Sequence, residues 1–186
     1  MKKICVYCGA SKGLGREYSD AAEALGVEMA RRNLGLVYGG GSMGLMGKVS
    51  SAVHKSGGTV LGIIPKELEP VEISGLTVGK AVVTRDMHER KKNMFTLSDA
   101  FIALPGGFGT LEELLEMITW QQLGFHSKPI GILNVNGFFD SLLCFFSEAV
   151  LAGFISQESK DAILVSTSPS DLLDKLSSFR VTDHKF

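Results

Sequence analysis

The stretch AFIALPGGFGTLEELLEMITW, residues 100–120, contains a strand, a glycine-rich turn and a helix in immediate succession. Residues 100–104 form an uninterrupted apolar run, which is typical of a strand buried on both faces of a parallel sheet. From residue 111 the apolar side chains recur with the spacing of one helix face, and we expect this helix to extend to residue 123. The segment therefore predicts one strand–turn–helix unit of a parallel sheet.

The same alternation extends in both directions along the chain. Further strands are predicted over residues 4–8, 34–38, 59–64, 80–84, 129–133 and 162–165, and helices over 16–32, 42–55, 87–97, 138–151 and 169–178. Residues 66–79 show no clear period, and we interpret them as an extended loop. Strands that alternate with helices indicate βαβ units. We expect an α/β fold, a Rossmann-like doubly wound parallel sheet in a three-layer α/β/α sandwich. Residues 1–186 suit one such domain.

Composition excludes several classes of partner. The 19 basic and 20 acidic residues give a net charge of −1, so no basic excess is present to attract a nucleic acid. No apolar run approaches the roughly 20 residues of a membrane span, and the short N-terminal segment lacks a signal sequence, which predicts a cytoplasmic protein. The 3 cysteines form no disulfide framework, and no set of metal ligands accompanies them. We therefore expect a small-molecule partner and no metal or other cofactor.

The glycine turn of the first segment has the features of a phosphate site. Ligands of such sheets bind at the carboxyl ends of strands, where this turn lies. Gly106, Gly107 and Gly109 allow the backbone to approach a ligand, and the helix start offers unpaired N–H groups and a partial positive charge. The hydroxyl of Thr110 can add a hydrogen bond, and Glu113 follows in the helix. The alternative is a tight turn of purely structural purpose.

A second glycine cluster, Gly39–Gly47, also lies between a strand and a helix. It contains a G-x-G-x-x-G pattern, but the following strand ends without the acidic residue that a dinucleotide fold needs for the ribose. A phosphate-binding P-loop is excluded because Ser42 and Val49 replace its leading glycine and its final Ser/Thr. We interpret Gly40, Gly41 and Gly44 as a second backbone wall of a nucleotide pocket; a structural turn is the alternative.

Two further segments supply candidate side chains. Residues 9–13 match the G-x-S-x-G pattern of a nucleophile elbow, but no histidine stands in a convincing loop after a late strand to complete a triad. Gly9 and Ser11 are therefore assigned to the nucleotide pocket. On the predicted helix 87–97, Arg90 and Lys91 can reach a phosphate or a ribose. A solvated basic helix face is the alternative for this pair.

Four ordered motifs resemble the LOG (Lonely Guy) family, the cytokinin riboside 5′-monophosphate phosphoribohydrolases. The family pattern P-G-G-x-G-T-x-x-E is complete over residues 105–113, and M-H-x-R-K is complete over residues 87–91. The openings C-x-x-C-G-[AS]-S and V-Y-G-G-G-S-x-G-L-M-G occupy residues 5–11 and 37–47. The resemblance runs from about residue 3 to residue 165, nearly the whole chain. Members are often labelled "possible lysine decarboxylase".

This resemblance implies an activity and a set of roles. The activity is hydrolysis of the N-glycosidic bond of adenosine 5′-monophosphate, plain or N6-modified, to a free base and ribose 5-phosphate. Arg90 and Glu113 match the catalytic pair of the family, and a homodimer is implied. The positions that match substrate contacts are Glu72, Lys91, Gly106, Gly107, Phe108, Gly109, Thr110, Leu111, Glu112 and Thr119.

The reaction suggests what the catalytic pair does. Cleavage passes through an oxocarbenium-like state, so a carboxylate such as that of Glu113 stabilises the ribose cation or activates water. Arg90 holds the ribose or the phosphate, or stabilises the departing base; the sequence leaves these three roles open, as it does the preferred base. Two rival functions remain: a non-catalytic nucleotide or cofactor carrier on the same fold, and a pyridoxal-phosphate-dependent lysine decarboxylase.

Overall fold

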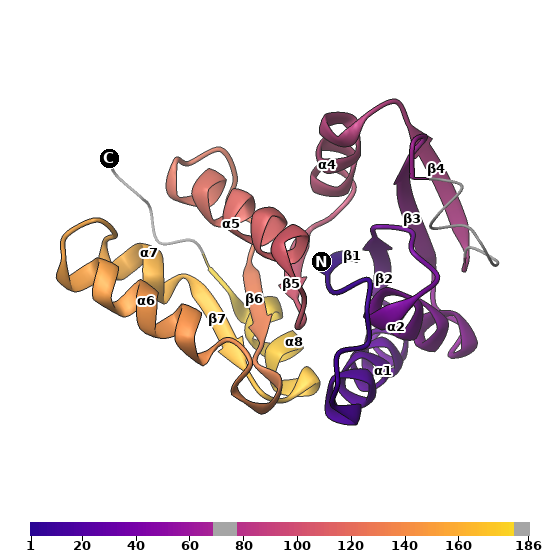
Figure 1. The fold of residues 1–186 in the computed structure, drawn as a ribbon, viewed down its shortest axis with the longest axis horizontal. Coiled ribbons are helices and arrows are strands. Elements are labelled where there is room, and N and C mark those ends of the chain that lie inside the picture. Colours follow the sequence, from indigo (N-terminus) through magenta and orange to yellow (C-terminus); the bar gives the residue numbers. More distant parts are fainter. Residues whose placement is uncertain (69–77, 181–186) are drawn as a thin grey trace.

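A computed structural model describes residues 1–68 and 78–180, and within them one sheet of seven parallel strands (Figure 1). The strand order is β4-β3-β2-β1-β5-β6-β7, and every neighbouring pair is parallel. The strands are β1 Lys3–Tyr7, β2 Gly35–Tyr38, β3 Val60–Pro65, β4 Lys80–Thr84, β5 Ala100–Ala103, β6 Ile130–Leu133 and β7 Ile163–Ser166. The expected Rossmann-like parallel sheet is confirmed.

Helices cover both faces of the sheet. They are α1 Arg16–Arg31, α2 Gly44–Lys55, α4 Met87–Thr96, α5 Phe108–Gln122, α6 Asp140–Leu151, α7 Gln157–Asp161 and α8 Pro169–Ser178, with a 3₁₀ turn η1 over Val135–Gly137. Apolar side chains of α1, α2 and α8 pack on one face, and those of α4, α5 and α6 pack on the other. Figure 1 shows α1 and α2 opposite α4 and α5 across the strands. The result is the expected three-layer sandwich.

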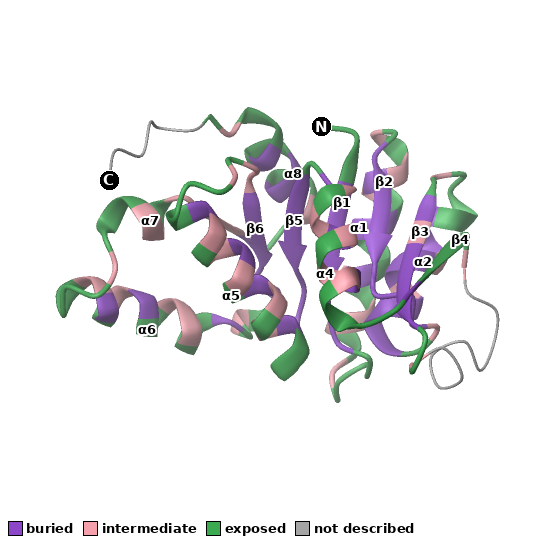
Figure 2. Cartoon of the chain, turned by 90° about the horizontal axis from the view of Figure 1, so that it is seen from above, coloured by how far each residue is buried: buried purple, intermediate pink, exposed green. Residues whose placement is uncertain are grey.

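The core follows from the alternation of side chains along the central strands. On β1, Ile4 and Val6 point to the layer of α1 and α2, whereas Cys5 and Tyr7 point to the layer of α4 and α5. Both faces of such a strand are buried, which explains its continuous apolar sequence. Figure 2 shows β1, β2 and β5 buried and the edge strand β4 exposed. The prediction of strands buried on both faces therefore holds for the centre of the sheet and fails at this edge.

The strand order reverses between β1 and β5, and this switch point determines where a ligand can bind. Cys5 pairs with Phe101 in the register of these two strands. Just beyond their carboxyl ends, the backbone N–H of Gly9 donates to the carbonyl of Pro105 at 3.0 Å. The loops after β1 and β5 therefore touch, and the crevice of a doubly wound sheet opens beside them.

Several helix boundaries differ from the sequence predictions, and one helix was not predicted. Helix α5 begins at Phe108 instead of residue 111, because Gly107 acts as its N-cap and its carbonyl accepts from the N–H of Leu111 at 3.1 Å. Helix α2 begins at Gly44, two residues later than expected. The short helix α7 was not predicted; the side chain of Ser156 caps its first turn. The predicted loop over residues 66–79 lies largely outside the described residues.

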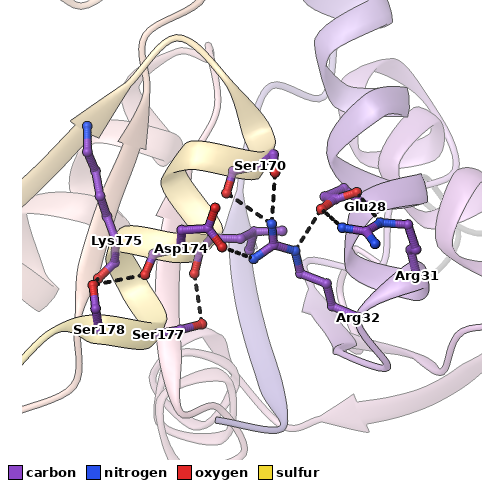
Figure 3. Close-up of polar contacts among 9 residues, drawn as sticks. Glu28, Arg31, Arg32, Ser170, Asp174, Lys175, Ser177 and Ser178 are labelled. Carbon is purple, nitrogen blue, oxygen red and sulfur yellow. Dashed lines mark hydrogen bonds and ion pairs between the residues drawn. The ribbon is translucent and has the colours of Figure 1, made fainter.

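A polar network joins α1 to α8 on the face opposite α4 and α5 (Figure 3). Arg32, directly after α1, donates to Glu28 at 2.7 Å and to Asp174 at 2.6 Å. Its remaining nitrogen donates to the hydroxyl of Ser170 at 2.8 Å. The contact fixes the C-terminal helix against the first helix and lies away from the switch point.

Candidate active site

A cavity of about 520 Å³ opens at the switch point, at the carboxyl ends of β1 and β2. The first turns of α2, α4 and α5 complete its walls. The lining residues are Val6, Tyr7, Cys8, Gly9, Ala10, Ser11, Gly39, Met46, Arg90, Gly107, Gly109, Thr110 and Glu113. The cavity thus combines two glycine segments with a basic and an acidic side chain.

One wall is the N-terminus of α5. A methyl group built on Gly107 or Gly109 would meet no atom within 4 Å, so both glycines present bare backbone to open space. Gly106, in contrast, is packed so tightly between Thr110 and Gly9 that a Cβ has no room. The first N–H groups of a helix lack partners within the helix and carry its partial positive charge. This wall is therefore suited to hold a phosphate.

Arg90 and Glu113 face each other across the cavity. Asp86 caps α4 by accepting from the N–H of Glu89 at 2.8 Å, and Arg90, the fourth residue of the helix, lies at the end of its first turn. The Nη2 atom of Arg90 lies 3.7 Å from Oε1 of Glu113, and the two side chains are only 9% and 12% exposed. The Nη1 atom donates weakly to Sδ of Met87 at 3.6 Å. The buried Nε of Arg90 has no acceptor among the described residues.

Burial changes the acidity of Glu113. Loss of water around the carboxyl raises its pKa to about 7, against the opposing attraction of Arg90. The neighbouring acids Glu112 and Glu116 raise the pKa further, and Lys91 lowers it. A carboxyl of this kind changes charge near neutral pH, as acid–base groups of enzymes do. It can stabilise a cation or activate a water when ionised.

Lys91 lies beside the cavity and is not among its lining residues. Its ammonium group bridges α4 and α5 by contacts of 2.5 Å to Glu112 and 2.9 Å to Glu116. The side chain is 17% exposed. Lys91 therefore balances two of the acidic charges around Glu113 and links the two helices that carry Arg90 and Glu113.

The structure brings together about half of the residues predicted from the sequence. Seven line the cavity: Gly9, Ser11, Arg90, Gly107, Gly109, Thr110 and Glu113. Those outside its lining are Gly40, Gly41, Gly44, Lys91, Gly106, Phe108, Leu111, Glu112 and Thr119. Phe108 and Thr119 are exposed on α5, and Leu111 packs against the core. Glu72 lies outside the described residues.

The second glycine cluster is used differently from the first. Gly40, with φ +84°, packs its α-carbon against Ile64, and Gly44, with φ +61°, packs against the carbonyl of Ala10. The N–H of Leu45 in the first turn of α2 donates to the carbonyl of Gly9 at 3.0 Å. This helix start is therefore engaged by the loop after β1. Contacts of Gly40, Gly41 and Gly44 with a substrate stay a prediction.

Several lining residues were missed by sequence reasoning. Tyr7, the last residue of β1, and Cys8, which follows it, belong to the strand predicted over residues 4–8; both are buried, and both line the cavity. Met46 was not singled out, and it lines the cavity while 8% exposed. Gly39 was counted as part of its cluster and not singled out. The sequence signal for Tyr7 and Cys8 is their position at the carboxyl end of a predicted strand.

Two observations on the described residues concern metal binding and membrane insertion. Within residues 1–68 and 78–180, no three His, Cys, Asp or Glu side chains are grouped as ligands of a metal ion. Across the same residues, none of the helices has both the length and the apolarity to cross a bilayer.

Comparison with known proteins identifies the family. A family model described as "Possible lysine decarboxylase" matches residues 46–176. A cytokinin riboside 5′-monophosphate phosphoribohydrolase of Arabidopsis thaliana is 55% identical over 178 residues, which cover 96% of this chain and 83% of the plant protein. A probable enzyme of the same name from Oryza sativa subsp. japonica is 54% identical, over 96% of this chain and 71% of its own.

A solved structure agrees on the fold. The molybdenum cofactor binding protein of the phototrophic bacterium Rippkaea orientalis superimposes with a TM-score of 0.71 at 24% identity, over 96% of this chain and 97% of that one. This likeness concerns the fold alone. Taken with the motifs around the cavity and the two plant relatives, the family match leads to one conclusion: the chain belongs to the LOG family of cytokinin riboside 5′-monophosphate phosphoribohydrolases.

Proposed function

We propose that the protein hydrolyses the N-glycosidic bond of adenosine 5′-monophosphate, plain or carrying an N6 substituent, to the free base and ribose 5-phosphate. The observation that carries the proposal is the position of the buried Arg90–Glu113 pair, in one cavity with the open N-terminus of α5. Relatives at 54–55% identity carry the name of this activity.

The spacing along α5 fits the substrate. Glu113 is five residues beyond Phe108, the first residue of the helix, which corresponds to about 7.5 Å along its axis. A ribose 5-phosphate anchored by its phosphate at the helix start has a comparable length. Its anomeric carbon then comes to lie near the carboxylate of Glu113. Binding energy from the phosphate thereby positions the reacting carbon.

In the proposed reaction, Glu113 acts on the ribose and the water, and Arg90 holds the substrate. As the bond between the anomeric carbon and the base nitrogen breaks, its electron pair leaves with the base and positive charge grows on the ribose. The ionised carboxylate of Glu113 stabilises that charge and takes a proton from the water that adds to the carbon; transfer of this proton to the departing base nitrogen gives the neutral base and restores the carboxylate. The guanidinium group of Arg90 lines the same cavity and holds the substrate beside Glu113.

A panel of substrates tests the proposal. Purified protein is incubated with nucleoside monophosphates, the matching nucleosides and triphosphates, and the free base and ribose 5-phosphate are quantified. We expect turnover of the monophosphates alone, because the nucleosides lack the anchoring phosphate. Binding of the monophosphate without any turnover would instead support a carrier. Decarboxylation of lysine, with the yellow colour of bound pyridoxal phosphate, would overturn the proposal.

We further propose that the protein acts as a cytoplasmic homodimer. The LOG resemblance supports this assembly, and so do exposed apolar side chains on α5, where Leu115 is 39% and Leu123 is 46% exposed. A second copy of the chain would remove these side chains from water. Sedimentation equilibrium of the protein and of Leu115→Lys tests the assembly: a dimer is expected for the first and a weakened dimer for the second.

A further inference from the structure

Gly39 lies on the cavity wall directly beneath the guanidinium group of Arg90. A Cβ built on Gly39 would fall less than 3.0 Å from Nη2 of Arg90 and 3.1 Å from Sδ of Met46. Real Cβ atoms essentially never approach other atoms below 3.0 Å. We propose that Gly39 is a positioning residue for the reaction proposed above: its missing side chain leaves the space in which Arg90 is held opposite Glu113.

The backbone of Gly39 has no freedom to move aside. It follows Tyr38, which pairs with Val6 at the centre of the sheet. It precedes Gly40, whose positive φ of +84° and contact with Ile64 fix the direction of the chain. A clash at Gly39 must therefore be relieved by Arg90 and not by the strand.

Arg90 also has neighbours on its own helix and on α5, and the cavity lies on its remaining side. Its helix is capped by Asp86, its Nη1 atom contacts Met87 at 3.6 Å, and Glu113 stands 3.7 Å from its Nη2 atom. Restoring an ordinary contact to a methyl group on Gly39 requires Nη2 to move by about 1 Å. A misplacement of that size is enough to cost about 10²-fold in rate at a catalytic site.

The cost to folding is small, which separates this role from a structural one. Gly39 is not among the glycines with positive φ, so alanine fits its backbone. The clashing atom is the end of a long, flexible side chain that can turn into the open cavity. Gly40→Ala is the contrasting case, because it combines a positive φ with a clash against buried Ile64. We expect Gly40→Ala to lower the melting temperature and Gly39→Ala to leave it nearly unchanged.

The primary experiment is Gly39→Ala assayed with adenosine 5′-monophosphate. We expect kcat to fall about 100-fold, while the inhibition constant of ribose 5-phosphate changes only a few-fold, since the α5 wall is intact. In an Arg90→Ala background, adding Gly39→Ala should cause no further loss. Such non-additivity is expected only if the glycine acts through the arginine. Additive losses, or an unchanged kcat, would overturn the proposal.

The pH profile gives an independent readout. The charged groups around Glu113 are Arg90 and Lys91 of α4 and Glu112 and Glu116 of α5. From β1, Cys5, Tyr7 and Cys8 face it in neutral form, because burial raises the pKa of each well above the working range. Displacing Arg90 removes an attraction that lowers the pKa of Glu113. The acidic limb of kcat/KM in Gly39→Ala should therefore move to higher pH, and an unmoved limb would contradict the displacement.

Failure of this inference differs from failure of the proposed function. If Arg90→Ala or Glu113→Gln keeps full turnover, the proposed catalytic pair is wrong. If both variants lose turnover and Gly39→Ala keeps the rate of the parent protein, only the positioning role of Gly39 is refuted.

Discussion

The side chains of Arg90 and Glu113 are close enough to attract each other and too far apart to share a hydrogen bond, with 3.7 Å between Nη2 and Oε1. In a site so little exposed to water, each charge lowers the cost of burying the other. Because the two side chains do not hydrogen-bond to each other, both can form hydrogen bonds with a substrate. This arrangement distinguishes the pair from Arg32 and Glu28, which bond directly at 2.7 Å.

The activity of the protein should rise with pH through neutrality. Glu113 must be ionised to stabilise a cation, and burial raises its pKa to about 7. We expect kcat/KM for adenosine 5′-monophosphate to show an acidic limb near pH 7, measured between pH 5 and 9. In Glu113→Gln the rate should fall at least 100-fold and this limb should vanish from the residual rate. Turnover of Glu113→Gln near that of the parent protein would contradict the assignment.

The same carboxyl should destabilise the fold above neutral pH. Unfolded chains release this proton near pH 4.5, whereas folded chains retain it up to about pH 7. Between these values unfolding releases a proton, so the contribution of Glu113 to stability falls as pH rises, by about 3 kcal/mol in full. Glu113→Gln lacks this dependence. Its melting temperature relative to the parent protein should increase by several degrees between pH 5 and pH 8; a constant difference would be the contrary result.

Lys91→Met should move the acidic limb of kcat/KM to higher pH. The ammonium group lowers the pKa of Glu113, and its loss also leaves Glu112 and Glu116 without their cation. Lys92→Met, the next residue of the same helix with an exposed side chain, is the matched control and should leave the profile unchanged. If Lys91 contacts the substrate instead, as the LOG resemblance implies, KM should rise at every pH while the limb stays in place.

Gly109→Ala should stabilise the fold and weaken substrate binding. The residue lies in the first turn of α5, where alanine is favoured over glycine by up to about 1 kcal/mol, and a Cβ there meets no protein atom. That Cβ projects into open space at a glycine that lines the cavity, where we place the phosphate. We expect a higher melting temperature together with a higher KM for adenosine 5′-monophosphate. A higher melting temperature with unchanged KM would place the phosphate elsewhere.

Arg32→Ala should affect stability alone. The guanidinium group hydrogen-bonds to Glu28, Ser170 and Asp174 (Figure 3). Because the side chain of Asp174 is 67% exposed, its ion pair with Arg32 contributes less to stability. A loss of about 1–2 kcal/mol is expected. For a chain of this size it corresponds to a fall of about 2–8 °C in melting temperature. The kcat of the variant should equal that of the parent protein, and a reduced kcat would show that α8 communicates with the cavity.

The sequence predicts the sheet and names two residues, Arg90 and Glu113, that the structure brings into one cavity, but it does not predict features that depend on tertiary packing. The apolar run of β5 and the glycines after it place a cavity at a strand end, because these features depend on local chemistry. The role of each glycine in the cluster 39–47 depends instead on which side chains pack against it in the folded protein. Gly40 accommodates Ile64, whereas Gly39 accommodates Arg90, which lies 51 residues further along the chain. Spacing alone cannot tell these two glycines apart.

Helix boundaries show the same limit. Gly107 and Gly109 resemble loop residues by propensity, yet the helix begins between them, because the carbonyl of Gly107 accepts from the N–H of Leu111. Glu113 thereby occupies the second turn instead of the first. The exposed edge strand β4 also departs from the rule of buried parallel strands, since only one strand neighbours it in the sheet.

The pairing of β1 with β5 has a consequence for biosynthesis. Lys3 donates its N–H to Asp99, 96 residues further along the chain. The paired residues of β1 and β5, such as Ile4 and Ala100, are equally far apart in sequence. Contacts of such long sequence separation form slowly. A nascent chain released before β5 is made carries β1 with one unpaired edge, which invites association with other chains. Growth of the polypeptide past Glu113 is the point in translation at which the chain first contains every residue that lines the cavity.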